Sequence, residues 1–329
     1  MSLAGHLWTI TPNLRHRLMP VQPPPGEPWS TEFRDPTMGL IRLTGTLRTP
    51  PGARTLLVIV HGLAGSERSH YVARAAWAAE QAGLASLRLN LRGADGRGED
   101  LYHAGLTADL HAALASPRLA RFSAVYILGY SLGGHLALCY GTEAVDPRVR
   151  RVGAICPPLD IEPCIIAIDG PELLLYRANI LRCLAAQYAT VTARRSMPVT
   201  GAQARAIASM REWDTRILAP RHGFASAEDY YERASVGPRL HRLRVPAVLV
   251  AAEHDPMVPA WSVRSWLAAA PPTLTVHWVG RGGHVGFPPD LDLGYVAALG
   301  LEPQALSWLL NGDSAAEPAA PAARRATNR

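Results

Sequence analysis

Residues 124–134, AVYILGYSLGG, contain the most informative local pattern of this chain. The apolar run from Ala124 to Leu128 is typical of a buried β-strand, and a helical pattern begins at Leu132. Two glycines flank Ser131 in a G-x-S-x-G motif, which is weak evidence by itself. Between a strand and a helix, the motif predicts a sharp turn that presents the serine hydroxyl at a helix N-terminus. We therefore predict that Ser131 is a nucleophile; the alternative is a glycine-rich turn with an N-cap serine.

A serine hydroxyl is a poor nucleophile at neutral pH, so this interpretation requires a base and an orienting carboxylate. On such a scaffold the expected chain order is serine, then acid, then histidine. Asp255 follows the predicted strand Ala247 to Ala252, and His284 follows the predicted strand Thr273 to Val279. Because functional sites of open α/β sheets form at the carboxyl ends of the strands, both side chains are expected near Ser131. We predict that Asp255 orients His284, which deprotonates Ser131.

Each of these assignments has a simpler alternative. Asp255 precedes a proline and could be a turn residue, and Glu253 is a competing carboxylate two positions away. Asp160, just after the predicted strand Arg151 to Ile155, is the fallback for the acid. His284 lies among glycines and could be a surface loop residue. The occurrence of all three motifs in the required order, at the required edge, favours the catalytic interpretation.

A tetrahedral intermediate also needs hydrogen-bond donors for its oxyanion. The backbone amide of Leu132, directly after the nucleophile, is one expected donor. The loop from His61 to Ser66 follows the predicted strand Thr55 to Val60 and is expected to supply the other, which we assign to Leu63. We interpret His61 itself as a structural residue that fixes this loop rather than as a second base.

Short apolar runs rich in β-branched residues alternate along the chain with longer amphipathic stretches. This alternation predicts an α/β protein with a mostly parallel central sheet and helices on both faces. Strands are expected at 40–48, 55–60, 84–89, 124–128, 151–155, 247–252 and 273–279. Helices are expected at 71–81, 106–115, 132–140, 172–186, 202–211 and 227–233.

The alternation is interrupted once, over residues 157–243, where only helical patterns occur. This interruption predicts an inserted helical cap, so the α/β core would comprise residues 31–156 and 244–312. Its apolar residues could line an acyl pocket, but a helix that packs on the core has the same pattern and is the more common case. The residues in question are Leu173, Leu174, Leu175, Ile180, Leu181 and Leu184.

The two ends of the chain have compositions unlike the rest. Residues 1–30 include Pro23, Pro24, Pro25 and Pro28, and we expect an extended segment that crosses the surface without joining a helix or a sheet. Residues 313–329 consist largely of Ala, Pro and Arg with almost nothing large to bury. We expect them to form a disordered tail.

Composition excludes several classes of protein. All 33 basic residues are Arg and none occurs in a run longer than two, so no nucleic-acid partner is expected despite the formal charge of +6. No uncharged apolar stretch approaches the roughly 18 to 20 residues that span a bilayer, so no transmembrane segment is expected. Residues 1–20 lack the apolar run of a secretory signal, which predicts a cytoplasmic location. Four cysteines without C-x-x-C spacing are expected to be buried free thiols in a reducing compartment.

Several motifs along the chain resemble those of one known family. Together they resemble the α/β-hydrolase superfamily and, within it, the YheT-like branch, which is related to the eukaryotic abhydrolase-domain lipid hydrolases. The resemblance extends from Gly5 to about Leu310. It is carried by residues 5–10 (GHLWTI), 61–66 (HGLAGS), 89–93 (LNLRG), 102–105 (YHAG), 129–134 (GYSLGG), 211–214 (REWD), 222–231 (HGFASAEDYY) and 282–287 (GGHVGF).

The resemblance implies an α/β-hydrolase fold and hydrolysis of carboxylic esters with short-chain or lipid-like acyl groups. The triad of the family falls on Ser131, Asp255 and His284, the residues already assigned. The chain departs from the branch at Trp8, where Gln is expected. Ala104 and Leu106 also depart, because they occupy positions expected to be small polar and acidic. These departures weaken any substrate specificity inferred from better-known members.

The expected partner is therefore a small-molecule or lipid-like ester. Neither a metal nor a cofactor is expected, because no metal-ligand spacing and no dinucleotide fingerprint is present. An acyltransferase or thioesterase with the same triad is one alternative, and a non-catalytic binding protein on the same fold is another. The sequence leaves peripheral membrane contact and the oligomeric state open.

Overall fold

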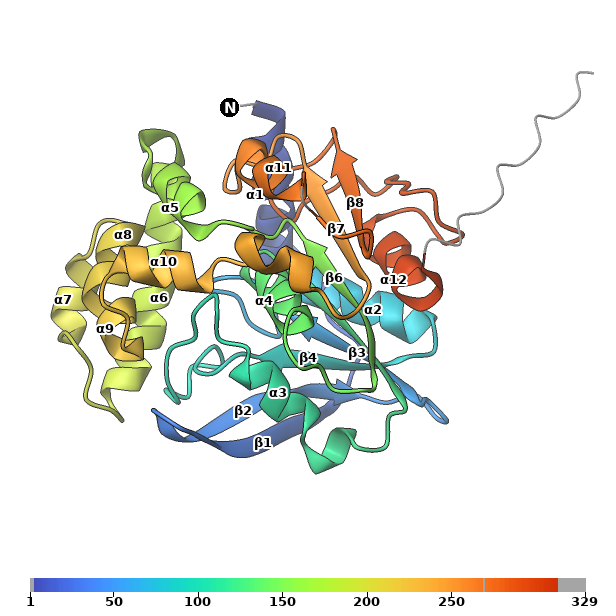
Figure 1. The fold of residues 1–329 in the computed structure, drawn as a ribbon, viewed down its shortest axis with the longest axis horizontal. Helices are drawn as coiled ribbons and strands as arrows, with labels where there is room; N and C mark the ends of the chain where they lie inside the picture. Colours follow the sequence, from blue (N-terminus) through green and yellow to red (C-terminus); the bar gives the residue numbers. More distant parts are fainter. Residues whose placement is uncertain (1–2, 269, 313–329) are drawn as a thin grey trace, which may run out of the picture.

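The computed structural model describes residues 3–268 and 270–312. These residues contain one eight-stranded sheet with the strand order β1-β2-β4-β3-β5-β6-β7-β8 (Figure 1). The strands are β1 (Glu27–Asp35), β2 (Gly39–Arg48), β3 (Thr55–Val60), β4 (Ala85–Asn90), β5 (Ala124–Tyr130), β6 (Val149–Ile155), β7 (Ala247–Ala252) and β8 (Leu274–Val279). The strands from β3 to β8 pair in parallel with one another in the sheet. At one edge, β1 pairs with β2 and β2 pairs with β4, both in the antiparallel direction. The predicted mostly parallel sheet is confirmed.

The residues of β3 show why the sheet needs helices on both faces. Leu56, Val58 and Val60 belong to one apolar core, and Leu57 and Ile59 belong to a second core on the other side. Successive side chains of a strand point to opposite faces, so an unbroken apolar run requires cover on both. α3 (Ala108–Leu114), α4 (Leu132–Gly141) and α11 (Ala260–Leu267) contribute to the first core, and α2 (His70–Gln81) and α12 (Leu301–Asn311) contribute to the second.

The expectation of an extended segment over residues 1–30 is wrong in two places. Leu3–Leu18 form helix α1, although Pro12 lies inside it. The proline run begins only after this helix, so it does not constrain the residues before it. Pro28 lies within β1, which pairs with β2 in register. A proline can occupy β1 because this strand is at the edge of the sheet, where one side of the backbone needs no partner.

Between β6 and β7 the chain forms only helices and turns, in a segment that the structure describes completely. We call residues 157–246 the helical insert; its treatment as a separate cap, with the predicted boundaries, stays a prediction. The predicted helix at 202–211 is two shorter helices, and α5 was not predicted. The helices are α5 (Ile161–Asp169), α6 (Leu174–Thr192), α7 (Gly201–Ala206), α8 (Met210–Trp213), α9 (Ala219–His222) and α10 (Ala227–Ala234).

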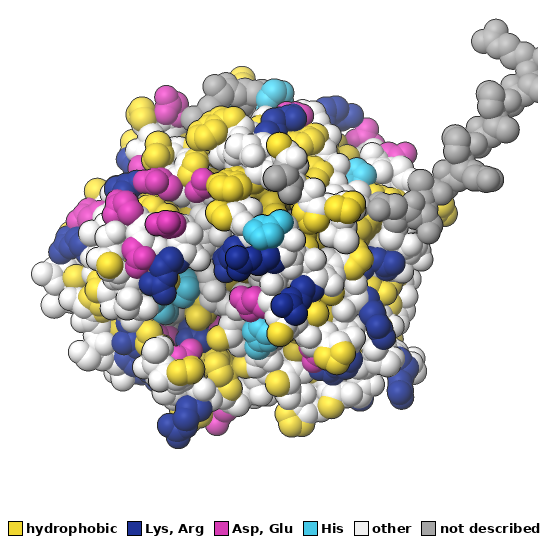
Figure 2. Space-filling view, in the orientation of Figure 1, with side chains coloured by type: hydrophobic (Ala, Val, Ile, Leu, Met, Phe, Trp, Pro, Cys, Tyr) yellow, Lys and Arg dark blue, Asp and Glu magenta, His cyan; other side chains and the backbone are white. Residues whose placement is uncertain are grey.

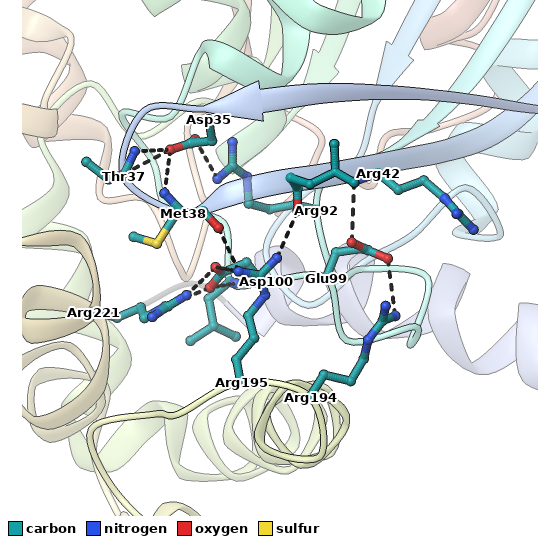
Figure 3. Close-up of polar contacts among 12 residues, drawn as sticks. Asp35, Thr37, Met38, Arg42, Arg92, Glu99, Asp100, Arg194, Arg195 and Arg221 are labelled. Atoms are coloured by element: carbon teal, nitrogen blue, oxygen red, sulfur yellow. Dashed lines mark hydrogen bonds and ion pairs between the residues drawn. The ribbon is translucent and has the colours of Figure 1, made fainter.

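Arginines of the helical insert attach it to the loops of the core (Figure 3). Arg221 makes a two-pronged ion pair with the buried carboxylate of Asp100, at 2.9 and 2.5 Å. Arg195 donates to the carbonyl oxygens of Met38 and Leu40 at the β1–β2 turn. These contacts fix the insert at one end of the sheet, because a paired arginine fork holds both distance and angle.

Several expectations rest on the composition of the chain. Figure 2 shows that basic side chains on the visible face are spread among acidic and apolar ones. Among helices of the described residues, none is both long and apolar enough to cross a membrane. All four cysteines are free; Cys139, Cys156 and Cys164 are buried, whereas Cys183 is only half-buried, which corrects the expectation for that residue. The predicted tail, 313–329, lies outside the described residues.

Candidate active site

Ser131 lies in the sharp turn between β5 and α4, as the motif predicted. Its φ of 53° is in the left-handed region, which non-glycine residues adopt only under constraint. A side chain at Gly129 would overlap the carbonyl oxygen of Gly133, and one at Gly133 would overlap that of Val60. The two glycines therefore allow the strand and the helix to approach closely enough to hold the serine in this conformation.

The structure brings the three predicted side chains together. His284 Nε2 lies 2.8 Å from Ser131 Oγ, and His284 Nδ1 lies 2.8 Å from Asp255 Oδ2. The other carboxylate oxygen of Asp255 accepts the backbone amides of Met257 and Val258. Both members of the histidine–carboxylate pair are buried, so water does not compete for these hydrogen bonds.

The two competing carboxylates occupy other positions. Glu253 pairs with Arg264, and no hydrogen bond or ion pair with His284 is present for it among the described residues. Asp160 precedes α5, and its carbonyl oxygen accepts the Cys164 thiol. Asp255 is therefore the acid whose geometry fits the histidine.

The loop after β3 passes directly over the serine. A side chain at Gly62 would come within 3.1 Å of Ser131 Cβ, so this glycine permits the close approach. Among the described residues, neither the amide of Leu63 nor that of Leu132 donates to a protein acceptor. Both residues line the cavity at Ser131. Their assignment as oxyanion donors stays a prediction that this arrangement supports.

The buried ring of His61 fixes that loop through two hydrogen bonds. Its Nε2 accepts the amide of Leu91 at 3.2 Å, so Nδ1 carries the proton and donates to the Gly62 carbonyl at 2.8 Å. Complete burial lowers the pKa of His61 to about 4, which keeps the ring neutral. Tyr71 and Tyr102 accept further loop amides through their hydroxyls. These contacts agree with the structural role predicted for His61.

Two hollows meet at Ser131 and His284. The first lies under the helical insert and is mainly apolar; we call it the acyl pocket, after the ligand that we propose for it. The second, which we call the entrance groove, lies between α1 and α6 and includes Ile10, Leu14 and Leu175. The acyl pocket is lined by α5 and the following helices through Ile161, Cys164, Ile165, Ile168, Leu184, Met210, Trp213 and Leu218.

The predicted apolar cluster of the insert contributes little to the acyl pocket. Among its six members only Leu184 lines it, while Leu175 and Ile180 line the entrance groove. Leu173 is fully buried in the core, and Leu174 is 55% exposed. The packing interpretation therefore fits more of these residues than the pocket interpretation. Helix α5 supplies the pocket wall, and its pattern in the sequence was missed because it is short.

Residues 57–298 match the family described as "Alpha/beta hydrolase family". The chain belongs to the α/β hydrolase family.

This α/β hydrolase is 31% identical over 238 residues to "Putative esterase YheT" of Escherichia coli, covering 70% of each chain. It is 26% identical to "Monoacylglycerol lipase" of Saccharomyces cerevisiae, covering 72% of this chain and 56% of the yeast protein. It is 25% identical to human "Phospholipase ABHD3", covering 71% and 59%. The hydrolase thus spans less than two thirds of the two eukaryotic relatives. A solved structure, α/β hydrolase GrgF from Penicillium sp. sh18, shares the fold with a TM-score of 0.51 at 18% identity, covering 78% of this chain and 91% of that chain.

One residue that positions His284 in this α/β hydrolase was not predicted from the sequence. Thr9 of α1 accepts the amide of His284 through Oγ1 at 2.8 Å. The same hydroxyl donates to the Gly5 carbonyl at 2.8 Å. Gly5 itself cannot carry a side chain, because it would overlap the carbonyl oxygen of His254 next to the acid. Thr9 lay within a motif of the family resemblance, but only the fold brings it to the histidine.

A second residue was also missed, in the acyl pocket of the hydrolase. Asp214 is buried, lines the pocket and accepts the Tyr231 hydroxyl at 2.9 Å. Burial, above all other causes, raises the pKa of Asp214 to about 7. Near neutral pH the pocket therefore contains a carboxyl group that is partly uncharged.

Cys156, Asp255 and His284 are the one group of potential metal ligands that converge among the described residues. The histidine nitrogens are already engaged by Ser131 and Asp255. Burial raises the pKa of the Cys156 thiol well above its usual range, so the thiol is a poor ligand. The donor set does not fit a metal site, and we assign none to it.

Proposed function

We propose that this protein is a serine hydrolase that cleaves carboxylic esters with lipid-like acyl groups through an acyl-enzyme. The observation that carries the proposal is the chain of two 2.8 Å hydrogen bonds from Asp255 through His284 to Ser131, at the mouth of an apolar pocket. The esterase and lipase names of the relatives support the same reaction class.

In the first step, Ser131 Oγ attacks the ester carbonyl carbon while its proton moves to His284 Nε2. Asp255 accepts from Nδ1–H, which keeps Nε2 free as the base and stabilises the imidazolium that forms. The carbonyl oxygen becomes an oxyanion, and the amides of Leu63 and Leu132 donate to it. Preorganised donors stabilise this charge because they need no reorientation when it forms.

Collapse of this intermediate breaks the bond to the alcohol oxygen. His284 gives its proton to the departing alkoxide, which leaves as an alcohol, and the acyl group remains on Ser131. A water molecule then attacks the acyl carbon while His284 takes its proton. The second collapse returns the proton to Ser131 and releases the carboxylic acid.

The two hollows support the substrate class. The acyl pocket offers apolar walls from α5 and α8, which favours an aliphatic acyl chain. The entrance groove opens toward α1 and offers room for the alcohol portion. Each methylene buried in an apolar pocket stabilises binding by about 0.8 kcal/mol, so such a pocket selects for chain length.

A fluorophosphonate probe tests the nucleophile. It should label Ser131, and Ser131→Ala should abolish both the labelling and, by a thousandfold or more, the hydrolysis of p-nitrophenyl esters, an effect of about the size expected for a triad nucleophile. Ser265→Ala, at an exposed serine of α11, is the matched control and should retain both. Labelling at another serine, or undiminished turnover in Ser131→Ala, would overturn the proposal.

A further inference from the structure

Helix α1 has its apolar face turned away from the protein. Its buried residues are Gly5 and Thr9, which contact the loops of Asp255 and His284. On the opposite side of the helix lies what we call the α1 stripe, whose members are 47% to 76% exposed. The α1 stripe consists of Leu3, Leu7, Ile10, Leu14 and Leu18.

The spacing of the α1 stripe, four, three, four and four residues, places its members in one row along the helix. A surface helix of a globular protein normally places such a row against the core. Here the buried residues of the helix are Gly5 and Thr9, and none of the exposed row is among them, so this row does not arise from packing within the chain. An exposed apolar surface of this kind indicates an interaction site.

Charge around the α1 stripe indicates what it contacts. Residues 3–18 contain Arg15 and Arg17 and no Asp or Glu. Arg17 and Arg182 of α6 both donate to the neutral amide oxygen of Asn179, at 3.4 and 3.0 Å. Within the described part of the chain, no carboxylate pairs with any of these three arginines. Two cationic groups that converge on a neutral acceptor complement an anionic surface and would repel a second copy of the same face.

The α1 stripe continues into the entrance groove. Ile10 and Leu14 belong to both, and Leu175 of α6, 83% exposed, lies on the other side of the groove. His6 Nδ1 lies 3.1 Å from the Tyr176 hydroxyl, which joins the two helices at this point. A flat apolar layer that covered the stripe would therefore cover the mouth of the groove as well.

We infer that α1 and the N-terminal end of α6, where Leu175 is exposed, dock this protein on an anionic lipid surface, with the entrance groove facing the lipid. An apolar helix face flanked by arginines and free of acidic residues is suited to lie in the plane of such an interface. The supply of substrate from the lipid layer rests on the proposed function. The docking itself does not, because it requires no catalysis.

Sedimentation of the full chain with lipid vesicles tests the docking. The Ser131→Ala variant is used, so that turnover has no influence on the result. It should bind vesicles of phosphatidylcholine with phosphatidylglycerol, and bind those of phosphatidylcholine alone more weakly. The combined change Leu3→Gln, Leu7→Gln and Leu18→Gln should weaken binding about tenfold or more, since glutamine retains helix propensity but not the apolar surface.

The matched control is the combined change Leu40→Gln, Val296→Gln and Leu299→Gln. These side chains are 55% to 74% exposed but lie outside α1 and α6. The control should bind vesicles as the parent does. Arg15→Gln with Arg17→Gln tests the charge separately and should weaken binding to the anionic vesicles about fivefold for each arginine.

Three outcomes would overturn the inference. The first is the absence of vesicle binding, and the second is an equal loss of binding in the control variant. The third is a dimer, seen by light scattering, that the α1 change dissociates, since a second copy would then occupy the stripe. Hydrolysis of a short p-nitrophenyl ester, measured without vesicles, reports on the proposed function separately.

Discussion

The backbone amide of His284 donates to the hydroxyl of Thr9, 275 positions earlier in the chain, at 2.8 Å. This hydrogen bond connects the first helix to the loop that carries the predicted base. Both residues are buried, so the amide has no access to water if the hydroxyl is removed. The N-terminal helix is therefore part of the framework that positions His284, although it lies outside the sheet.

Thr9→Val is expected to lower kcat about ten- to a hundredfold with little change in KM. An unpaired buried amide costs about 1 to 3 kcal/mol, and the histidine loop can relieve this cost only by moving. Thr9→Ser keeps the hydroxyl and should retain most of the activity. The rate of fluorophosphonate labelling at Ser131 gives an independent measurement. An unchanged labelling rate in folded Thr9→Val would show that this hydrogen bond does not position the histidine.

Asp255→Asn should reduce kcat by three to four orders of magnitude, about the loss seen when a triad acid is neutralised. The amide oxygen can still accept from Met257 and Val258, so the NH2 group would face His284. The ring would then carry its proton on Nε2 and could not deprotonate Ser131. Glu253→Gln and Asp160→Asn are the controls, and steady-state kinetics should show mild effects. A larger loss in either control would transfer the role of the acid to that residue.

Ile165→Phe should shorten the range of acyl chains that the protein accepts. Ile165 lines the acyl pocket from α5, and a larger side chain there fills space that an acyl chain would occupy. In the parent, kcat/KM for p-nitrophenyl esters should rise up to about fourfold for each added methylene until the pocket is full. The variant should reach its maximum at a shorter chain and spare the acetate.

Leu174→Phe is the matched control for the pocket, because Leu174 is more than half exposed and lines neither hollow at Ser131. Its chain-length profile should equal that of the parent. If Ile165→Phe also left the profile unchanged, the acyl chain would lie elsewhere, and the entrance groove would be the next candidate.

Asp214→Asn should change how stability depends on pH. The folded-state pKa of Asp214 is raised to about 7 from the ordinary value of 3.8, so the folded protein keeps a proton that the unfolded chain loses. Between these values the unfolded state binds fewer protons, and rising pH therefore reduces stability by at most about 1.4 kcal/mol per unit. Asparagine cannot ionise and removes this contribution.

Urea unfolding of the parent and of Asp214→Asn between pH 4 and 8 measures this effect. The free energy of unfolding of the variant, relative to the parent, should increase from pH 4 to about pH 7 and then level off. Tyr231→Phe, which removes the hydroxyl that Asp214 accepts, should not abolish the pH dependence, since burial is the main cause of the shift. A difference that is independent of pH would contradict the raised pKa.

The sequence alone predicts the parallel part of the sheet and the chain positions of the candidate catalytic residues. The apolar runs 55–60 and 247–252 agree with β3 and β7 at both ends. They were predictable because a strand buried on both faces has an unbroken apolar run of its own length. The same logic predicted Ser131, His284 and an acid after β7, with Asp255 preferred but Glu253 still open, since each lies just beyond a strand whose end is fixed by that local pattern.

Features that depend on contacts between distant segments follow from the folded structure and not from local sequence. β1 is a polar, proline-containing edge strand that is recognisable by its pairing with β2 rather than by its composition. α1 turns its apolar residues outward, so periodicity alone would orient it the wrong way round. Distances of a few ångströms across the fold decide that Asp255 and not Glu253 pairs with His284. They also decide which residues line the acyl pocket and that Thr9 accepts the amide of His284. A local pattern specifies which face of an element is apolar, but not which partner that face meets.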